Sequence, residues 1–516
     1  MRPGLPRPPF ALWLQHPTRP GQAMTDDLSQ PSRKPSLLPV QMVVLTMLAL
    51  RLWIQLAADP DGDEAYYWLW GQHLGLSYFD HPPLNAWLQR SVSMVLGWNV
   101  IGLRALTWVT LAGTLLIFRN WARRLMPEDA ATGFWYLSAI YLCSPVFFLM
   151  GLAALHDHLM LFLCLASAHF FLRFTERFEG GNTRPLDLYL GAALLGLAVL
   201  TKYTAAVYGI GVGLFFLTRR PLRPLLGNPH LWLAALLSLA IQTPVLWWNL
   251  VEGFATFRYH FATRWTDGVR LSLDTAQQTV PRFLVYSLLS LSPFLIVPMA
   301  RGLLTRPQPG FAARLKALAL PTFLTSSLAM LAWSTAVIIA FYWNILAYLL
   351  LFPLALGYIG RRWQFWAHAI LGLVAAGLLV INTTQVPIAT LLGGYDRASA
   401  FNFGWAELAT EVRAARLAHP DSFLVTTRYN SASQLAFALQ DPDVTTLRPE
   451  PDQFKYWFEP AKHAGRNALV LADADVGIDY AQTRFERITQ LREITIIRHN
   501  LPILTYRLYL GEGFRP

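Results

Sequence analysis

Long apolar runs joined by short Arg-rich connections constrain this chain more than any other feature. Many of the runs approach or exceed the ~18 residues that a helix needs to cross a bilayer. A soluble protein carries roughly 25% charged residues, whereas only 14% of these 516 residues are charged. A soluble multidomain enzyme would need polar helix faces, and these runs have none. The sequence therefore predicts an α-helical polytopic membrane protein.

The apolar runs predict about eleven helical spans. They lie near residues 38–58, 100–118, 131–149, 158–173, 187–201, 204–218, 231–249, 280–300, 318–339, 345–360 and 365–382. Several are shorter than a full crossing, so neighbouring spans can merge, or one can be re-entrant.

The net charge of +11 is unevenly distributed along the chain. Residues 1–382 hold 28 Lys and Arg against 16 Asp and Glu, while residues 383–516 hold 14 against 15. The excess therefore marks the connections between spans and argues against a nucleic-acid-binding tail. The positive-inside rule places these connections in the cytoplasm, and an odd number of spans then places the last 134 residues outside.

The two ends of the chain differ from the membrane part. Residues 1–36 are rich in Pro and Arg without an apolar signal region, so we expect a disordered cytoplasmic N-terminus, with Met24 as an alternative start. Residues 383–516 combine an amphipathic helix with strand-like runs, which predicts a small α/β domain. The helix is expected over 404–417, and the strands over 423–427, 444–447, 468–472, 494–497 and 503–510.

The loop after the first predicted span is the richest in polar chemistry. It begins DPDGDEAYYWLW, with the adjacent acids Asp63 and Glu64 followed by Tyr66 and Tyr67, and it continues to DHPP, which contains His81. An interfacial aromatic belt explains the tyrosines but not the acids packed against them. A carboxylate at this position can act as a base toward an acceptor hydroxyl or bind a divalent cation.

A second polar interruption, HDH, lies between two later apolar runs. His156, Asp157 and His158 are unfavourable there unless they have partners or face water. Asp157 can cap the following helix, or it can supply a second acid to a site that it shares with Asp63. The two histidines also suggest a metal, although no spacing motif supports one.

Cations and amides follow on the same predicted membrane face. Lys202 interrupts an apolar stretch, where it either extends to the interface or faces a lipid phosphate, as Arg258 and Arg264 of FRYHFATRW can. Cations beside a phosphodiester hold the donor and stabilise the charge on a leaving phosphate. Asn249 and Asn344, in WWN and YWN, can hydrogen-bond a sugar or simply belong to an interfacial belt.

In this order, five segments resemble a known family: DEAYYWLW with DHPPLNAWL, HDHLMLFL, LTKYTA, PVLWWN with EGFATF, and FYWN with AYLLLFPLA. The family is the bacterial branch of the dolichyl-phosphate-mannose protein mannosyltransferase-like family, which includes aminoarabinose and galacturonic acid transferases of lipid A and its core. The resemblance covers nearly the whole chain from about residue 37. It implies the GT-C fold, with a membrane domain over 37–382, a catalytic first outer loop at 59–99 and an extracytoplasmic α/β domain over 383–516.

The resemblance also implies a function. It implies an inverting glycosyltransferase that moves a sugar from a polyprenyl-phosphate donor to an extracytoplasmic acceptor, which we expect to be lipid A, its core or another envelope glycan. The enzyme would be a multi-pass protein of the bacterial inner membrane, with its site and C-terminus facing the periplasm. The family's acids fall on Asp63, with Glu64 beside it, and on Asp157, and its Lys-Tyr pair falls on Lys202 and Tyr203.

The residues and the resemblance together define one set of expectations. We expect catalytic Asp63, Glu64 and Asp157; donor-phosphate-binding Lys202, Tyr203, Arg258 and Arg264; and acceptor- or sugar-binding Tyr66, Tyr67, His81, Asn249 and Asn344. The histidines beside Asp157 depart from the family pattern, so a divalent metal ion stays open as a cofactor. The expected partners are the lipid-linked donor, an envelope acceptor and membrane lipid, without nucleic acid.

Two alternatives share parts of this chemistry. A transporter or flippase for a lipid-linked saccharide would use the same cations and aromatic residues, but it would place its charges near the bilayer midplane on broken helices. A polymer ligase or oligosaccharide transferase would share the donor chemistry.

Overall fold

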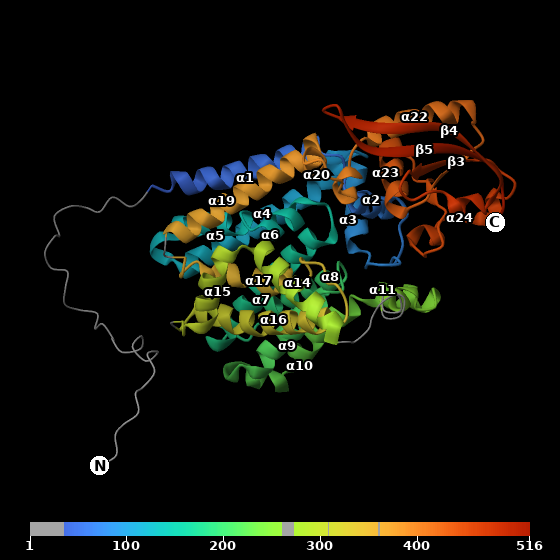
Figure 1. Ribbon diagram of the computed structural model, residues 1–516. Coiled ribbons are helices and arrows are strands. Elements are labelled where there is room, and N and C mark those ends of the chain that lie inside the picture. The colour runs from blue at the N-terminus through green and yellow to red at the C-terminus, as the bar shows by residue number, and fades with distance from the viewer. Residues whose placement is uncertain (1–35, 261–272, 308, 360–361) are drawn as a thin grey trace, which may run out of the picture.

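The computed structural model describes residues 36–260, 273–307, 309–359 and 362–516. The expected disordered N-terminus up to residue 35, with Met24, lies outside the described residues, and so does Arg264. A helical bundle forms most of the molecule, and a C-terminal α/β region (residues 386–516) lies beyond one end of it (Figure 1). The expected fold class, a helical membrane protein with a small C-terminal α/β part, is confirmed.

Within the described residues, five helical segments are long and apolar enough to cross a membrane. They are α1 (Leu38–Ala57), α4 (Val100–Leu125), α7 (His156–Glu179), α16 (Phe311–Ser334) and the segment Trp363–Gln385, which contains most of α19 (Arg362–Val380). Three shorter apolar units are α8 (Leu186–Val199), α9 (Ala205–Thr218) and the pair α17 (Ile345–Leu349) and α18 (Leu351–Ala355).

Three further units are bent pairs of helices. They are α5 (Ala130–Leu142) with α6 (Pro145–Leu152), bent by 80°, α10 (Pro229–Ala240) with α11 (Thr243–Val251), bent by 42°, and α14 (Leu273–Leu291) with α15 (Pro293–Leu304), bent by 92°. The second helix of each pair has a proline in its first two positions, at Pro145, Pro244 and Pro293. Because proline lacks an N–H and restricts the residue before it, the preceding helix ends there. Each expected span falls on one of these long, short or bent units.

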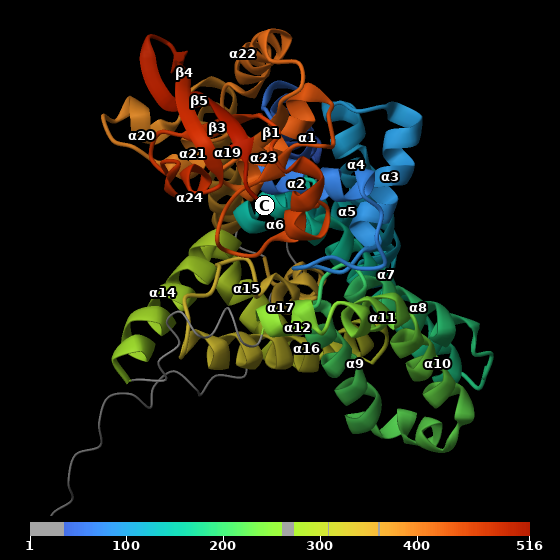
Figure 2. The same cartoon turned by 90° about the vertical axis from the view of Figure 1, so that its right-hand side faces the viewer.

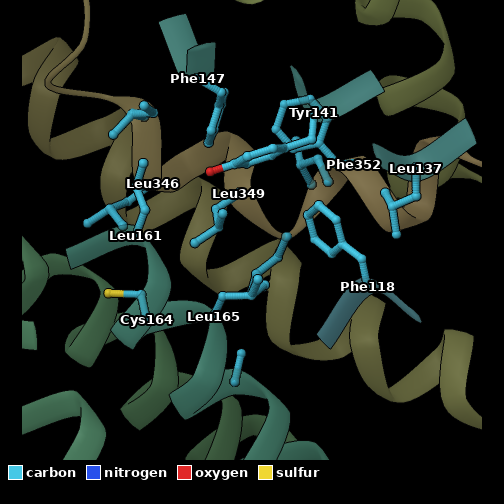
Figure 3. Packing of buried hydrophobic residues seen from close by; sticks show 14 of the residues in the cluster. Phe118, Leu137, Tyr141, Phe147, Leu161, Cys164, Leu165, Leu346, Leu349 and Phe352 are labelled. Atoms are coloured by element: carbon cyan, nitrogen blue, oxygen red, sulfur yellow. The ribbon is translucent and has the colours of Figure 1, made fainter. Parts of the chain in front are cut away.

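Aromatic packing joins the short helices to the long ones (Figure 3). The ring of Phe352 in α18 meets that of Phe147 in α6 edge-on at 4.6 Å, and Tyr141 in α5 lies 5.2 Å from Phe147. Phe118 in α4 is fully buried against Tyr141 at 5.3 Å. These ring contacts, two of them edge-to-face and one tilted, hold the discontinuous helices inside the bundle.

Acidic side chains form ion pairs with the Arg-rich connections at one end of the bundle. Glu179, the last residue of α7, pairs with Arg219 at 2.7 Å and with Arg314 at 2.8 Å, and Glu176 pairs with Arg124 at the end of α4. The 26 residues of α4 span ~39 Å. The beginning of α4 therefore lies at the other end, beside the C-terminal region (Figure 1).

The C-terminal region holds a five-stranded sheet of order β2-β1-β3-β5-β4. Its strands are β1 (Phe423–Thr426), β2 (Thr445–Thr446), β3 (Ala468–Asp473), β4 (Phe485–Arg498) and β5 (Leu501–Phe514). Strand β1 is parallel to β2 and β3, and β5 is antiparallel to β3 and β4. His499 and Asn500 both have positive φ, as a two-residue hairpin turn of primed type requires.

Helices α22 (Trp405–Ala418) and α23 (Tyr429–Leu439) pack on this sheet. The expected helix over 404–417 corresponds to α22, and all five expected strands occur, although β4 begins nine residues earlier than expected, at Phe485. No helix was expected where α23 lies. Its sequence, YNSASQLAFAL, does place Ala432, Leu435, Ala436 and Leu439 at the spacing of one helix face, so a short local signal was present and was missed.

Candidate active site

Helix α2 (Gly62–Gln72), in the first loop (residues 58–99), positions the two adjacent acids. Asp61 caps the helix: its side chain accepts from the backbone N–H of Asp63 at 3.0 Å, and Glu64 in turn accepts from the N–H of Asp61 at 2.9 Å. This reciprocal capping box satisfies two N–H groups that have no partner within the helix. Asp63 and Glu64 therefore project from the same first turn, but in different directions.

Glu64 lies in a buried ion pair. Its carboxylate is 2.7 Å from Nη2 of Arg104 in α4, which also donates from Nε at 3.2 Å, and it accepts from the N–H of Ala154 at 2.7 Å. Only 2% of Glu64 is exposed. Glu64 thus ties the first loop to α4 and to the segment that precedes α7, and these partners occupy both of its oxygens.

Asp157 and Lys202 meet directly. Asp157 lies in the first turn of α7, and Lys202 lies in the break between α8 and α9. The Lys202 ammonium is 2.8 Å from both carboxylate oxygens of Asp157, and both side chains are buried. Nζ also lies 5.0 Å from the ring centroid of Tyr342, a cation–π distance. The structure therefore joins the expected second acid and the expected phosphate-binding cation in one pair.

Aromatic rings connect this pair to the first loop. His156, beside Asp157, lies 4.1 Å from the ring of Tyr67 in α2 and 4.6 Å from that of His81. The Tyr66 hydroxyl accepts from the N–H of Gln453 in the C-terminal region at 3.2 Å. The first loop, the start of α7 and the C-terminal region thus meet around one cluster.

The electrostatic environments of the adjacent acids differ. Burial and the neighbouring charge of Asp61 raise the pKa of Asp63, a hydrogen bond from Tyr429 and the charge of Lys202 lower it, and the net pKa is about 6. Burial alone would also raise the pKa of Glu64, but the Arg104 guanidinium holds it below its usual value. Such separation is how one site obtains carboxylates with different roles. Asp63 is the one poised to exchange a proton near neutral pH.

The remaining expected residues divide into two groups. Asn249 donates to the carbonyl of Val245 and accepts from the N–H of Thr256, so it fixes the turn between α11 and α12 (Ala255–Arg258). Asn344 accepts from Ser326 at 2.8 Å and donates toward Tyr348. Both amides therefore bond to the protein itself.

Tyr203 and Arg258 lie nearer to the first loop. Tyr203 follows Lys202, and its ring lies 5.6 Å from that of His260, which bonds the carbonyl of Asp80. Arg258 is exposed at the end of α12. Arg264 is outside the described residues.

Three residues that contact the charged side chains of the candidate site were absent from the expected set. Arg104 and Tyr342 lie in or beside apolar runs, and an arginine inside such a run is itself a signal because it needs a buried partner. Tyr429 belongs to the C-terminal region and donates to Asp63 at 3.1 Å. Its sequence context gave no signal, because its partner lies 366 positions away.

The part of the chain that the structure describes contains no group of three or more His, Cys, Asp or Glu side chains arranged to hold a metal ion. His158, which raised the question of a metal, instead places Nδ1 3.0 Å from the hydroxyl of Thr110 in α4.

These features define a helical membrane protein of GT-C fold whose acidic first loop faces a buried Asp–Lys pair. The chain is similar over 92% of its length to ArnT from Cupriavidus metallidurans bound to undecaprenyl phosphate, with a TM-score of 0.61, 15% identity and 98% of that chain covered. The same protein in the apo state matches with a TM-score of 0.56 and 14% identity. These likenesses establish the shared fold.

Sequence comparisons point the same way. Residues 80–248 match the family described as dolichyl-phosphate-mannose-protein mannosyltransferase. A lipid A galacturonosyltransferase, RgtD of Rhizobium johnstonii, is 29% identical over 229 residues, which is 42% of this chain and 45% of that protein. The match thus spans less than half of the relative. Together, these findings confirm the resemblance to the bacterial branch of the GT-C mannosyltransferase-like family.

Proposed function

We propose that this protein is a membrane glycosyltransferase that moves a sugar from a polyprenyl-phosphate donor to lipid A, its core or a related envelope glycan, with inversion at the anomeric carbon. The observation that carries the proposal is the Asp63 carboxyl, half-buried in the first loop with a pKa of about 6, within electrostatic reach of the Lys202–Asp157 pair. A base and a cation from different elements are what displacement of a phosphate by a hydroxyl needs.

The proposed reaction is a single displacement. The acceptor hydroxyl oxygen forms a bond to the anomeric carbon while the bond from that carbon to the phosphate oxygen breaks. The hydroxyl proton moves to the Asp63 carboxylate, and the bonding electrons leave with the polyprenyl phosphate. Because the nucleophile and leaving group occupy opposite sides of the carbon, the configuration inverts.

Lys202 is proposed to stabilise the leaving phosphate. An ammonium has three N–H donors, and two of them point to the oxygens of Asp157. The third can donate to a phosphate oxygen. Asp157 then acts by fixing and neutralising Lys202 until the donor arrives, and Arg258, exposed on α12, can contribute a second positive charge.

Other expected roles change in this proposal. Glu64 holds the first loop against Arg104 instead of taking part in proton transfer. Asn249 and Asn344 shape the helix ends around the site. Tyr67 and His81, whose rings both contact His156, remain the candidates for contacting the sugar or acceptor.

The relatives support the substrate classes. The name of RgtD specifies a lipid A galacturonosyltransferase, and the ArnT structure contains undecaprenyl phosphate. We propose the same classes of acceptor and donor here, with the first loop and the C-terminal region on the periplasmic face of the inner membrane. The transporter alternative is less well supported, because Asp63 lies on α2, within the first loop, and not on one of the apolar helices that a transporter would break to form its site.

The test is mass spectrometry of the lipid A–core fraction from the host strain and from a deletion strain, complemented with the wild type or with Asp63→Asn. We expect the deletion to lose one sugar mass, which only the wild type restores. Loss of a positioned base typically lowers the rate by ~10²–10⁴. Full restoration by Asp63→Asn at a normal protein level would reject Asp63 as the base. A profile that the deletion leaves unchanged would reject lipid A and core as acceptors.

A further inference from the structure

Helix α23 brings the C-terminal region onto the first loop. Its first residue, Tyr429, donates from its hydroxyl to Oδ1 of Asp63 at 3.1 Å. Figure 2 shows α23 beside α2, and the two helices are in extensive contact. The candidate base therefore has a hydrogen-bond donor from a part of the chain that lies outside the helical bundle.

The phenol of Tyr429 is itself held in place. Its ring centroid lies 4.8 Å from that of Tyr66 in α2. The guanidinium of Arg448 lies over the Tyr429 ring, 6.0 Å from its centroid, at a cation–π distance. Burial and the carboxylate of Asp63 raise the pKa of Tyr429, so the phenol keeps its proton. A fixed donor of this kind restricts rotation of the carboxylate that accepts from it.

The surrounding interface is built for close approach. Asn402 donates to Asp61 at 3.3 Å, and Gln434 donates to the carbonyl of Pro60. A methyl group at Gly62 would lie 2.9 Å from Cβ of Asn430, tighter than real Cβ contacts allow. Only a glycine lets α23 and the first turn of α2 meet at this distance.

We propose that the C-terminal region completes the active site and that Tyr429 is a positioning residue, which holds Oδ1 of Asp63 so that the second carboxylate oxygen faces the acceptor hydroxyl. This inference rests on the proposed function, because it requires Asp63 to be the base. The phenol takes no proton and forms no bond to the substrate. It fixes the direction in which the carboxylate receives the acceptor's proton.

The test compares Tyr429→Phe with Tyr395→Phe in the full-length protein. Tyr395 also donates to an aspartate, Asp475, in the same region, so its variant is a matched loss of one Tyr–Asp hydrogen bond. Membranes from the deletion strain that contain each variant supply their own lipid-linked donor and acceptor. Sugar addition to lipid A–core is followed by mass spectrometry at pH values on both sides of 6.

For Tyr429→Phe we expect the rate to fall roughly 10- to 100-fold, the range of a lost hydrogen bond to a charged group. The acidic limb of the pH–rate profile should move to higher pH, because the phenol hydrogen bond lowers the pKa of Asp63. A purely structural role would reduce the amount of folded protein without moving that limb. Tyr395→Phe should match the wild type in its rate and in the position of the acidic limb.

An unchanged rate and profile for Tyr429→Phe, with Asp63→Asn inactive, would overturn this inference and leave the proposed function standing. Activity of Asp63→Asn would instead overturn the proposed function. Gly62→Ala is the second variant, since it removes no hydrogen-bonding atom but separates α23 from α2. It should produce the same upward shift of the acidic limb, and a wild-type profile for a folded Gly62→Ala protein would also contradict the inference.

Discussion

Lys202 places its ammonium 2.8 Å from each carboxylate oxygen of Asp157, so two side chains that were expected to act separately form one buried ion pair. Neither charge is solvated, and each depends on the other for compensation. In the proposed reaction the pair is a pre-positioned cation. In the folded protein it is also a bond between the start of α7 and the break between α8 and α9.

Substitution of one member of this pair should cost more stability than substitution of both. Lys202→Met leaves the Asp157 carboxylate buried without its cation, a change that typically costs about 3–5 kcal/mol. The double variant Lys202→Met, Asp157→Leu replaces the pair with apolar groups and should recover much of that loss. Thermal melting of detergent-solubilised protein measures the difference, and transfer should be lost in both variants. A double variant as unstable as the single one would contradict this account.

The pH dependence of transfer should respond to Asp61. The rate should rise as the pH increases through about 6, because Asp63 must lose its proton to act as a base. Asp61→Asn removes a negative charge that raises this pKa, while an Asn side chain still caps α2. The acidic limb should therefore move to lower pH. An unmoved limb, or one displaced upward, would show that Asp61 does not act on Asp63 in this way.

Glu64 should behave as a structural residue despite its position beside Asp63. Glu64→Gln leaves the buried Arg104 guanidinium without a carboxylate, and we expect a loss of about 3–5 kcal/mol. The matched control is Glu459→Gln, which removes an exposed pair with Lys462 and should change stability by about 0–1 kcal/mol. The protein level and the melting temperature of each variant measure the two effects on stability. Equal, small effects would mean that the Arg104 pair contributes little.

A second substitution at Asn430 should partly restore the activity that Gly62→Ala loses. Gly62→Ala introduces a methyl group against Cβ of Asn430, and Asn430→Gly removes that carbon. We expect the double variant to recover part of the transfer activity that Gly62→Ala loses, although Phe401 still lies 3.0 Å from the added methyl group. The readout is sugar addition to lipid A–core. A double variant no more active than Gly62→Ala would argue that the loss arises elsewhere.

Much of the fold was predictable because it depends on local pattern. A helix that crosses a bilayer must hydrogen-bond all its own backbone groups and present apolar side chains to the lipid. Such helices therefore appear in the sequence as apolar runs. The strands of the C-terminal region follow the same logic, since all five strand-like runs overlap with strands, although β4 begins nine residues before its run. The acidic first loop and the HDH and LTKYTA segments also stood out, because charged residues beside apolar runs are costly unless they have partners.

What the sequence by itself determined was therefore the fold class, the apolar helices of the bundle and the polar residues that interrupt them. The tertiary structure alone decided their roles. Asp63 and Glu64 are neighbours of nearly equal chemistry, yet Arg104, 40 positions away, occupies Glu64, while Tyr429, 366 positions away, donates to Asp63. Apolar periodicity is a property of short segments, whereas a carboxylate's pKa and hydrogen bonds depend on side chains that only folding brings within reach.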